Sequence, residues 1–268
     1  MLDTSAVRPR SQRVLPEPVT RRPRELERPT VLRQRWDEIA YFHWPYPPEV
    51  VQRLLPSGVT VDTFDGAAWV GLIPFEMRDV RIASGPVVPY LGRFIEVNVR
   101  TYVVDSLGRR AVWFFSLDVP RSWIVAVART VFALPYCWAY AGHQVVGDRH
   151  AYRTQRRWPR SGGPSSEMTF RVGGEIEDHE RTALDDFLTA RWALVTRRGD
   201  GLRYGPVQHP SWRLHRVGEV EIRDELIEAA GLPRPDGVPH ALYSPGTEVA
   251  VGWLEDVAPA AAAPGRVG

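Results

Sequence analysis

The chain has 268 residues, of which 44% are hydrophobic and ten are tryptophan, so it can bury a sizeable core. The formal net charge is only +2, and residues 1–35 alone hold nine arginines against four acidic residues, which leaves the remainder net acidic. We therefore expect no nucleic-acid partner. All 34 basic residues are arginine, which excludes any mechanism that needs a lysine Schiff base.

The single cysteine, Cys137, excludes an internal disulfide and fits a reducing compartment. No apolar run approaches the roughly 20 residues that a membrane helix needs. We therefore expect a cytoplasmic protein with no membrane partner, and the sequence leaves its oligomeric state open.

Residues 1–30 combine five prolines and seven arginines with little apolar periodicity. Such a segment buries too little apolar surface to offset the conformational entropy lost on folding. They are predicted to form a disordered leader, although its arginines leave contact with an acidic partner open. Residues 31–257 are predicted to form a single domain, and 258–268 a flexible tail.

The first half of the domain alternates short strands with proline and glycine signals. Asp65-Gly66 predicts a hairpin because glycine accepts the positive φ of a primed turn. Pro48 is placed where a first helical turn tolerates it. The expected elements are a strand at 36–44, a short helix at 48–55, strands at 59–63, 68–73 and 76–82, and a loop at 84–92.

The strand predicted at 94–104 has the cleanest alternation in the chain. Its isoleucine and valines fall on one face, and Glu96, Asn98, Arg100 and Tyr102 fall on the other. Neighbours on one face lie about 6 to 7 Å apart. This polar row suits a small anionic ligand if it faces the inside of a barrel.

The second half is also β-rich. The expected elements are a strand at 111–118, a helix at 122–132 whose β-branched residues leave a strand open, strands at 151–158 and 167–172, a helix at 180–190 capped by Asp178, a hairpin of 192–196 with 202–207, a strand at 212–222, a short helix capped by Asp224 and closed by Gly231, and a strand at 248–254. This order predicts an α+β fold, mostly antiparallel β, closed into a barrel with a few short flanking helices.

Several segments resemble the YqjF-like bacterial family, a domain of unknown function, in the order of that family over about residues 35–254. They are Phe42-His43-Trp44, Asp65-Gly66-Ala67-Ala68-Trp69-Val70, Glu96 to Val103, Phe114-Phe115-Ser116-Leu117-Asp118, Ala128-Arg129 through Leu134-Pro135-Tyr136, and His209-Pro210-Ser211-Trp212-Arg213-Leu214. The family is in turn remotely similar to acetoacetate decarboxylases. That similarity implies a closed conical antiparallel β-barrel with a central polar cavity.

The decarboxylases place a catalytic lysine pair directly after a proline, and Tyr136-Cys137 stands at that position here. Arg129 matches the arginine of their Gly-Arg-Glu motif, and Thr130 replaces its glutamate. The resemblance therefore implies the fold of the decarboxylases but not their lysine-dependent mechanism. Glu96 is a candidate match for a cavity glutamate of the decarboxylases.

Glu96 is the candidate general acid or base, and Arg100 the candidate carboxylate clamp, because a guanidinium binds a carboxylate in bidentate fashion. The alternative is that the polar face is solvated or that the two residues belong to a structural ion pair. Further candidate ligand contacts are Asn98, Tyr102, Arg129, Tyr136, Cys137, His43 and His209.

Cys137 can act as a nucleophile only if its pKa is lowered, with Arg129 as the available cation, and a small buried apolar residue is the alternative. The seven histidines show no ligand spacing beside Asp or Glu, and the sequence has no glycine-rich phosphate loop, nucleophile elbow or zinc-finger spacing. No metal and no cofactor are therefore expected, although a metal site assembled through the fold stays open.

These observations predict a barrel that binds a small carboxylate or carbonyl metabolite in a central polar cavity without a Schiff base. Two alternatives stay open: a lysine-independent lyase or hydratase acting on an oxo acid, and a structural or interaction protein. Whether the protein is an enzyme is left open as well.

Overall fold

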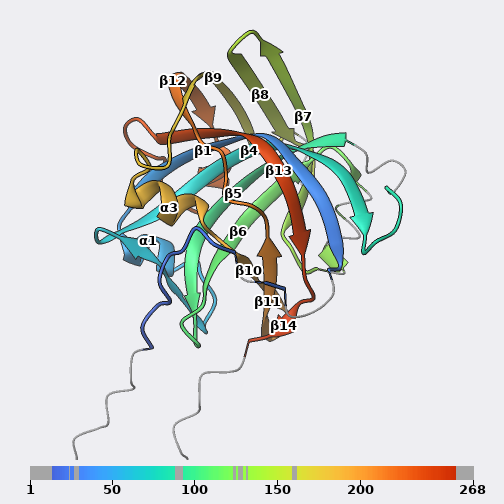
Figure 1. The fold of residues 1–268 in the computed structure, drawn as a ribbon, viewed down its shortest axis with the longest axis vertical. Coiled ribbons are helices and arrows are strands. Elements are labelled where there is room, and N and C mark those ends of the chain that lie inside the picture. The colour runs from blue at the N-terminus through green and yellow to red at the C-terminus, as the bar shows by residue number, and fades with distance from the viewer. Residues whose placement is uncertain are drawn as a thin grey trace, which may run out of the picture.

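The computed structural model describes residues 14–23, 25–26, 30–87, 93–122, 125, 129–130, 132–158 and 162–257. The described strands form one sheet that closes on itself, with short helices at its outside (Figure 1). No helix among the described residues is long and apolar enough to cross a membrane. The strands are β1 Leu32–Tyr46, β2 Val59–Val61, β3 Thr63–Phe64, β4 Ala67–Ile82, β5 Arg93–Asp105, β6 Arg110–Val119, β7 Tyr136–Val146, β8 Arg149–Arg156, β9 Ser165–Glu175, β10 Ala193–Arg198, β11 Gly201–Gln208, β12 His215–Asp224, β13 His240–Val251 and β14 Glu255–Asp256, and the helices are α1 Pro48–Gln52, α3 Ala183–Thr189 and α4 Leu226–Ala229.

Five neighbouring strands, in the order β13-β1-β4-β5-β6, form the centre of the sheet. At one end, β10 pairs with β6 and β11 pairs with β13, which closes a small ring. At the other end, β7, β8, β9 and β12 connect β6 back to β13 and close a larger ring. The pairing is antiparallel except where β6 meets β7 and β10. The predicted mostly antiparallel, closed β-barrel with few helices is therefore confirmed.

The two faces of the central strands pack against different partners. On β5, Val97 and Val99 are fully buried and belong to a core cluster with Tyr152, Met168 and Phe170 of the larger ring. Glu96, Asn98 and Arg100 instead line a cavity together with residues of β10 and β11. The alternation of the strand thus separates an apolar core from a cavity wall.

Several expected elements need correction. β7 is a strand where the sequence predicts none, and β13 begins eight residues earlier than expected. β2 pairs with β5, so only β3 forms the hairpin with β4 around Asp65 and Gly66, which have φ angles of 50° and 77°. The N-cap of α3 is Thr182, in a capping box with Asp185, rather than Asp178. The helix expected at 122–132 falls largely outside the described residues, as do part of the 84–92 loop and the tail.

A β-bulge interrupts the alternation of β1. Leu32, Gln34 and Trp36 line the cavity, and after the bulge Ile39 and Tyr41 line it. The pairing of β1 with β4 shifts register between Asp37 and Phe42, and Glu38 has a φ of 55° within this interval. On the other side of β1, Gly246 of β13 has a φ of 115°, and a Cβ there would overlap the carbonyl oxygen of Trp36. The bulge therefore depends on glycine at that position.

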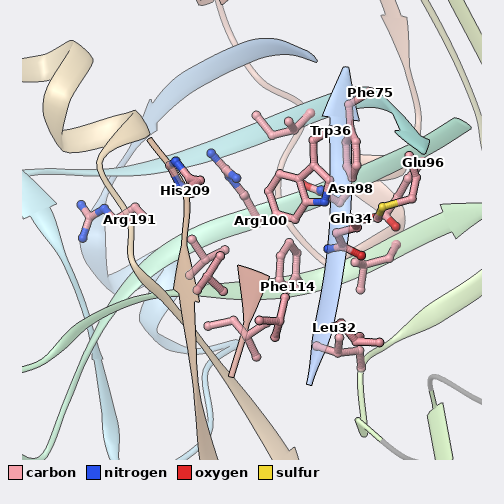
Figure 2. Close-up of a pocket in the computed structure, with 18 of the residues that line it drawn as sticks. Leu32, Gln34, Trp36, Phe75, Glu96, Asn98, Arg100, Phe114, Arg191 and His209 are labelled. Atoms are coloured by element: carbon pink, nitrogen blue, oxygen red, sulfur yellow. The ribbon is translucent and has the colours of Figure 1, made fainter. Parts of the chain in front are cut away.

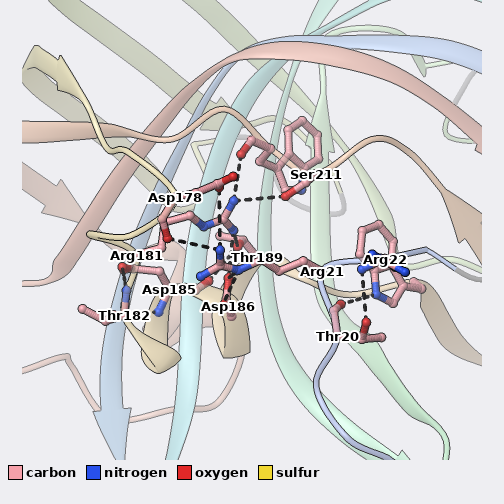
Figure 3. A network of polar contacts seen from close by, with 12 residues as sticks. Thr20, Arg21, Arg22, Asp178, Arg181, Thr182, Asp185, Asp186, Thr189 and Ser211 are labelled. Carbon is pink, nitrogen blue, oxygen red and sulfur yellow. Dashed lines mark hydrogen bonds and ion pairs between the residues drawn. The ribbon is translucent and has the colours of Figure 1, made fainter.

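Residues 14–23 belong to the leader that is predicted to be disordered, and several of them contact the barrel in the structure. The N–H of Glu17 donates to the carbonyl of Gly108 at 2.8 Å, and Trp192 Nε1 donates to the carbonyl of Thr20 at 2.8 Å. Figure 3 shows Arg21 reaching Asp186 of α3, with both carboxylate oxygens 2.9 Å from Nε. The composition of the segment does not reveal these contacts, because they are made by a few polar groups.

Candidate functional site

A cavity of about 400 Å³ lies inside the small ring, between the central strands and the pair β10 and β11 (Figure 2). This volume lies within the range of small-molecule sites, about 300 to 1,000 Å³. Its wall is mostly apolar, which corrects the expectation of a polar cavity. Polar side chains in the wall are those of Gln34, Tyr41, Glu96, Asn98, Arg100, Tyr136, Thr189, Arg191 and His209.

The predicted polar row of β5 forms part of this wall. Glu96, Asn98 and Arg100 all line the cavity and are at most 7% exposed. Tyr102 does not line it and supports Arg100 instead. Its hydroxyl accepts a hydrogen bond from Arg100 at 3.2 Å and lies 2.7 Å from the carbonyl oxygen of Leu188, to which it can donate.

Arg100 is a buried cation without a carboxylate partner among the described residues. Its guanidinium donates to Tyr102 and to the carbonyl of Leu188 at 3.3 Å, and its Nε has no hydrogen-bond partner. Two other buried arginines are treated differently: Arg191 pairs with Asp62 at 2.7 Å, and Arg156 forms a two-point pair with Asp118 at 2.6 and 2.9 Å. An unpaired buried charge is costly and attracts an anion.

Other polar atoms of the cavity wall also lack partners. The Tyr41 hydroxyl, Asn98 Oδ1 and Trp36 Nε1 are buried without a hydrogen bond from the described residues. Their residues line the same cavity as Arg100. Unsatisfied buried groups are rare in folded proteins, so a concentration of them in one wall marks a place for a polar ligand or for water.

Glu96 lies in a second polar part of the wall. The Tyr136 hydroxyl donates to its carboxylate at 3.1 Å. Burial raises the pKa of Glu96 to about 7, and hydrogen bonds from Tyr136 and Asn98 oppose that rise only in part. Both protonation states of this carboxyl are therefore populated near neutral pH, as a general acid or base requires.

Of the two histidines predicted to contact a ligand, His43 and His209, one lines the cavity and the other does not. His209 lines the cavity between the rings of Trp192 and Trp212, at centroid distances of 4.6 and 4.5 Å, and its Nδ1 lies 2.7 Å from the carbonyl oxygen of Pro210. Burial lowers the pKa of His209 to about 4, so the ring is neutral at pH 7. His43 does not line the cavity and lies 2.6 Å from the Tyr102 hydroxyl, where burial lowers its pKa well below the usual value.

Cys137 and Arg129 lie outside the cavity wall. The Cys137 thiol is buried, with Sγ 3.8 Å from the carbonyl oxygen of Pro135, and burial raises its pKa. A raised pKa keeps the thiol protonated and opposes a nucleophilic role. Arg129 is exposed, donates to the carbonyl of Tyr136 at 2.7 Å and lies over the ring of Trp158.

The sequence prediction missed Gln34, Trp36, Tyr41 and Arg191 as parts of the wall. The β1 residues escape a search for alternation because the bulge changes which positions face inward. Arg191 follows α3 in a segment without periodicity, so only the folded structure places it.

The fold is that of acetoacetate decarboxylase-like proteins. The chain is similar to an acetoacetate decarboxylase-like enzyme from Sphingomonas wittichii RW1, with a TM-score of 0.60 and 13% identity over 85% of this chain and 93% of that one. For the enduracididine biosynthesis enzyme MppR complexed with pyruvate, the TM-score is 0.60 and the identity 13%, over 87% of this chain and 92% of that one. For acetoacetate decarboxylase from Legionella pneumophila, the TM-score is 0.56 and the identity 14%, over 88% of this chain and 91% of that one. At these identities the likeness establishes the fold alone.

Sequence comparison defines the family. The model of DUF2071, described as an uncharacterized conserved protein, matches residues 33–248. The uncharacterized protein YqjF of Bacillus subtilis (strain 168) is 32% identical over 215 residues, which cover 80% of this chain and 87% of that protein. The chain therefore belongs to the DUF2071 family, and the predicted YqjF-like resemblance is confirmed.

Proposed function

We propose that this protein binds a small organic acid, with the carboxylate held by Arg100 and an apolar body held by the rest of the cavity wall. The observation that carries the proposal is the buried guanidinium of Arg100, which has no carboxylate partner in the described residues and lines a 400 Å³ cavity. A carboxylate there would supply the negative charge that Arg100 lacks and accept a hydrogen bond from its unpartnered Nε.

The unpartnered wall atoms favour a ligand with a second polar group near its carboxylate. The Tyr41 hydroxyl can donate to a carbonyl oxygen, and Asn98 Oδ1 can accept from a hydroxyl. Oxo and hydroxy acids carry such a group. A protein of the same fold is complexed with pyruvate, which makes this class the first to test.

The test is a thermal-shift and calorimetric screen with pyruvate, 2-oxohexanoate and phenylpyruvate, each beside its uncharged methyl ester. We expect the acids to raise the melting temperature and the esters not to, with tighter binding for the acids with larger apolar bodies. Arg100→Met should lose the response to the acids and unfold no more easily than the wild type, because it removes an uncompensated charge.

Arg156→Met is the matched control, since it also removes a buried arginine but leaves Asp118 unpaired. We expect it to cost about 3 to 5 kcal/mol of stability. If no acid stabilises the wild type, and Arg100→Met is destabilised as strongly as Arg156→Met, Arg100 has a structural role and the proposal fails.

A lysine-independent lyase or hydratase acting on an oxo acid is the second candidate, and the carboxyl of Glu96, with its pKa raised to about 7, favours it. Such a group can remove a proton next to a carbonyl and return it. In D2O, the wild type should exchange the C3 protons of an oxo acid faster than Glu96→Gln, as followed by NMR. Equal exchange rates for the two proteins would exclude this candidate.

A further inference from the structure

Three metal-ligating side chains come together outside the cavity, on three different strands. Glu38 comes from the bulge of β1, His143 from β7 and His150 from β8. His143 Nε2 lies 3.2 Å from His150 Nδ1, and His150 Nδ1 lies 3.6 Å from Glu38 Oε2. None of the three lines the cavity. The sequence shows no ligand spacing here because the group is assembled from distant segments.

Two of the three separations match those of ligands around one metal ion, and all three ligand atoms lie within 4.8 Å of one another. Zinc lies about 2.0 to 2.2 Å from imidazole nitrogen and carboxylate oxygen, so neighbouring ligand atoms of a tetrahedral site lie about 3.3 to 3.6 Å apart. The two distances of 3.2 and 3.6 Å lie close to the two ends of this range. A single ion can therefore contact all three groups after small side-chain movements.

Aromatic neighbours fix the orientation of the three groups. The Tyr243 hydroxyl donates to Glu38 Oε2 at 2.8 Å, and the Tyr152 hydroxyl donates to the carbonyl of Glu38. The ring of His143 stacks on Tyr152 with centroids 3.9 Å apart. Hydrogen bonds of this kind to ligating carboxylates are a regular part of metal sites.

The charges around the group also suit a cation. The negative charges nearby are those of Glu38 and Asp148. The positive charges of Arg78 and Arg93 also act on His143, but both arginines are paired with Glu76.

We propose that Glu38, His143 and His150 form a binding site for a divalent transition-metal ion, with zinc as the first choice. Two imidazoles and one carboxylate are a ligand set that zinc and iron(II) both use. Three protein ligands leave a coordination position open, and Glu38 and His143 are only half-buried, so water or a small ligand can reach the ion. This site is separate from the organic-acid cavity and does not depend on the function proposed for it.

The test is zinc binding to the metal-stripped full chain, measured by competition with a chromophoric chelator. We expect one tight site per chain in the wild type and an affinity lower by about 100-fold or more in His143→Ala, since even outer-shell changes cost 10- to 100-fold. His179→Ala, which removes an exposed histidine outside the group, should bind as the wild type does.

Cobalt(II) gives an independent readout on the same proteins. The wild type should develop visible absorption bands on addition of one equivalent, and Glu38→Gln should change or lose them. If the wild type binds zinc no more tightly than His143→Ala, the three side chains form only a hydrogen-bonded network and the proposal is overturned. A cobalt spectrum that is identical in Glu38→Gln would remove Glu38 from the ligand set and overturn it in this form.

Discussion

Replacing Glu96 with glutamine tests whether burial in the cavity raises the pKa of this carboxyl into the neutral range. Burial raises its pKa from 4.5 to about 7, so the folded protein binds this proton more tightly than the unfolded chain does. The favourable contribution is complete below pH 4.5 and is lost as the pH rises toward 7 and beyond. Glutamine is neutral throughout, so the variant lacks this pH dependence.

The magnitude follows from the two pKa values. Between pH 5 and pH 8 the wild type should lose about 2 to 3 kcal/mol of unfolding free energy relative to Glu96→Gln. Groups that titrate equally in both proteins cancel in the difference. Any constant offset caused by the altered hydrogen bond with Tyr136 also leaves the slope unchanged.

Urea unfolding of both proteins at pH 5, 6, 7 and 8 measures this difference. Glu228→Gln on α4 is the control, because it makes the same chemical change at an exposed position outside the cavity. A flat difference for Glu96→Gln would refute the reasoning, because it would mean that the ionised carboxylate is fully compensated in the folded protein.

Three further predictions concern stability and reactivity. Val97→Ala should cost about 1 to 3 kcal/mol in urea unfolding, since Val97 is fully buried in the core behind the cavity wall, and an unchanged midpoint would contradict that packing. Cys137 should stay unreactive toward a thiol reagent at pH 8 until urea unfolds the protein, and rapid labelling of the native state would show an accessible thiolate. Removing residues 1–23 should lower the melting temperature by several degrees, and an unchanged melting temperature would mean that this segment adds no stability. Arg21→Ala alone should cost less than about 1 kcal/mol of unfolding free energy, because the ion pair of Arg21 with Asp186 is partly exposed.

The polar row of β5 is predictable from sequence because regular alternation assigns each residue to one of two faces of the strand. Once Ile95, Val97 and Val99 are assigned to the core, Glu96 and Arg100 must lie on the opposite face. The same logic misses β7, whose burial is regular only near its start, where Cys137 and Ala139 are the buried residues. Small side chains in a short buried stretch give little signal above that of a loop.

Long-range pairing is the part of the barrel that sequence cannot supply. The small ring closes where Val207 and Gln208 of β11 meet Val251 and Ala250 of β13. Nothing in the composition of either strand specifies that partner. The cavity exists only after this closure, so Arg191 and Trp212 become parts of its wall through the fold and not through a local motif.

The bulge of β1 connects the two proposed sites. By adding one residue, it lets Trp36 and Tyr41 face the same cavity although they are five positions apart, a spacing that regular alternation would place on opposite faces. The extra residue, Glu38, contributes its carboxylate to His143 and His150 instead. The left-handed backbone at Glu38 and the hydrogen bond from the Tyr243 hydroxyl hold its carboxylate beside His143 and His150, so a change that removes the bulge should disturb both sites at once.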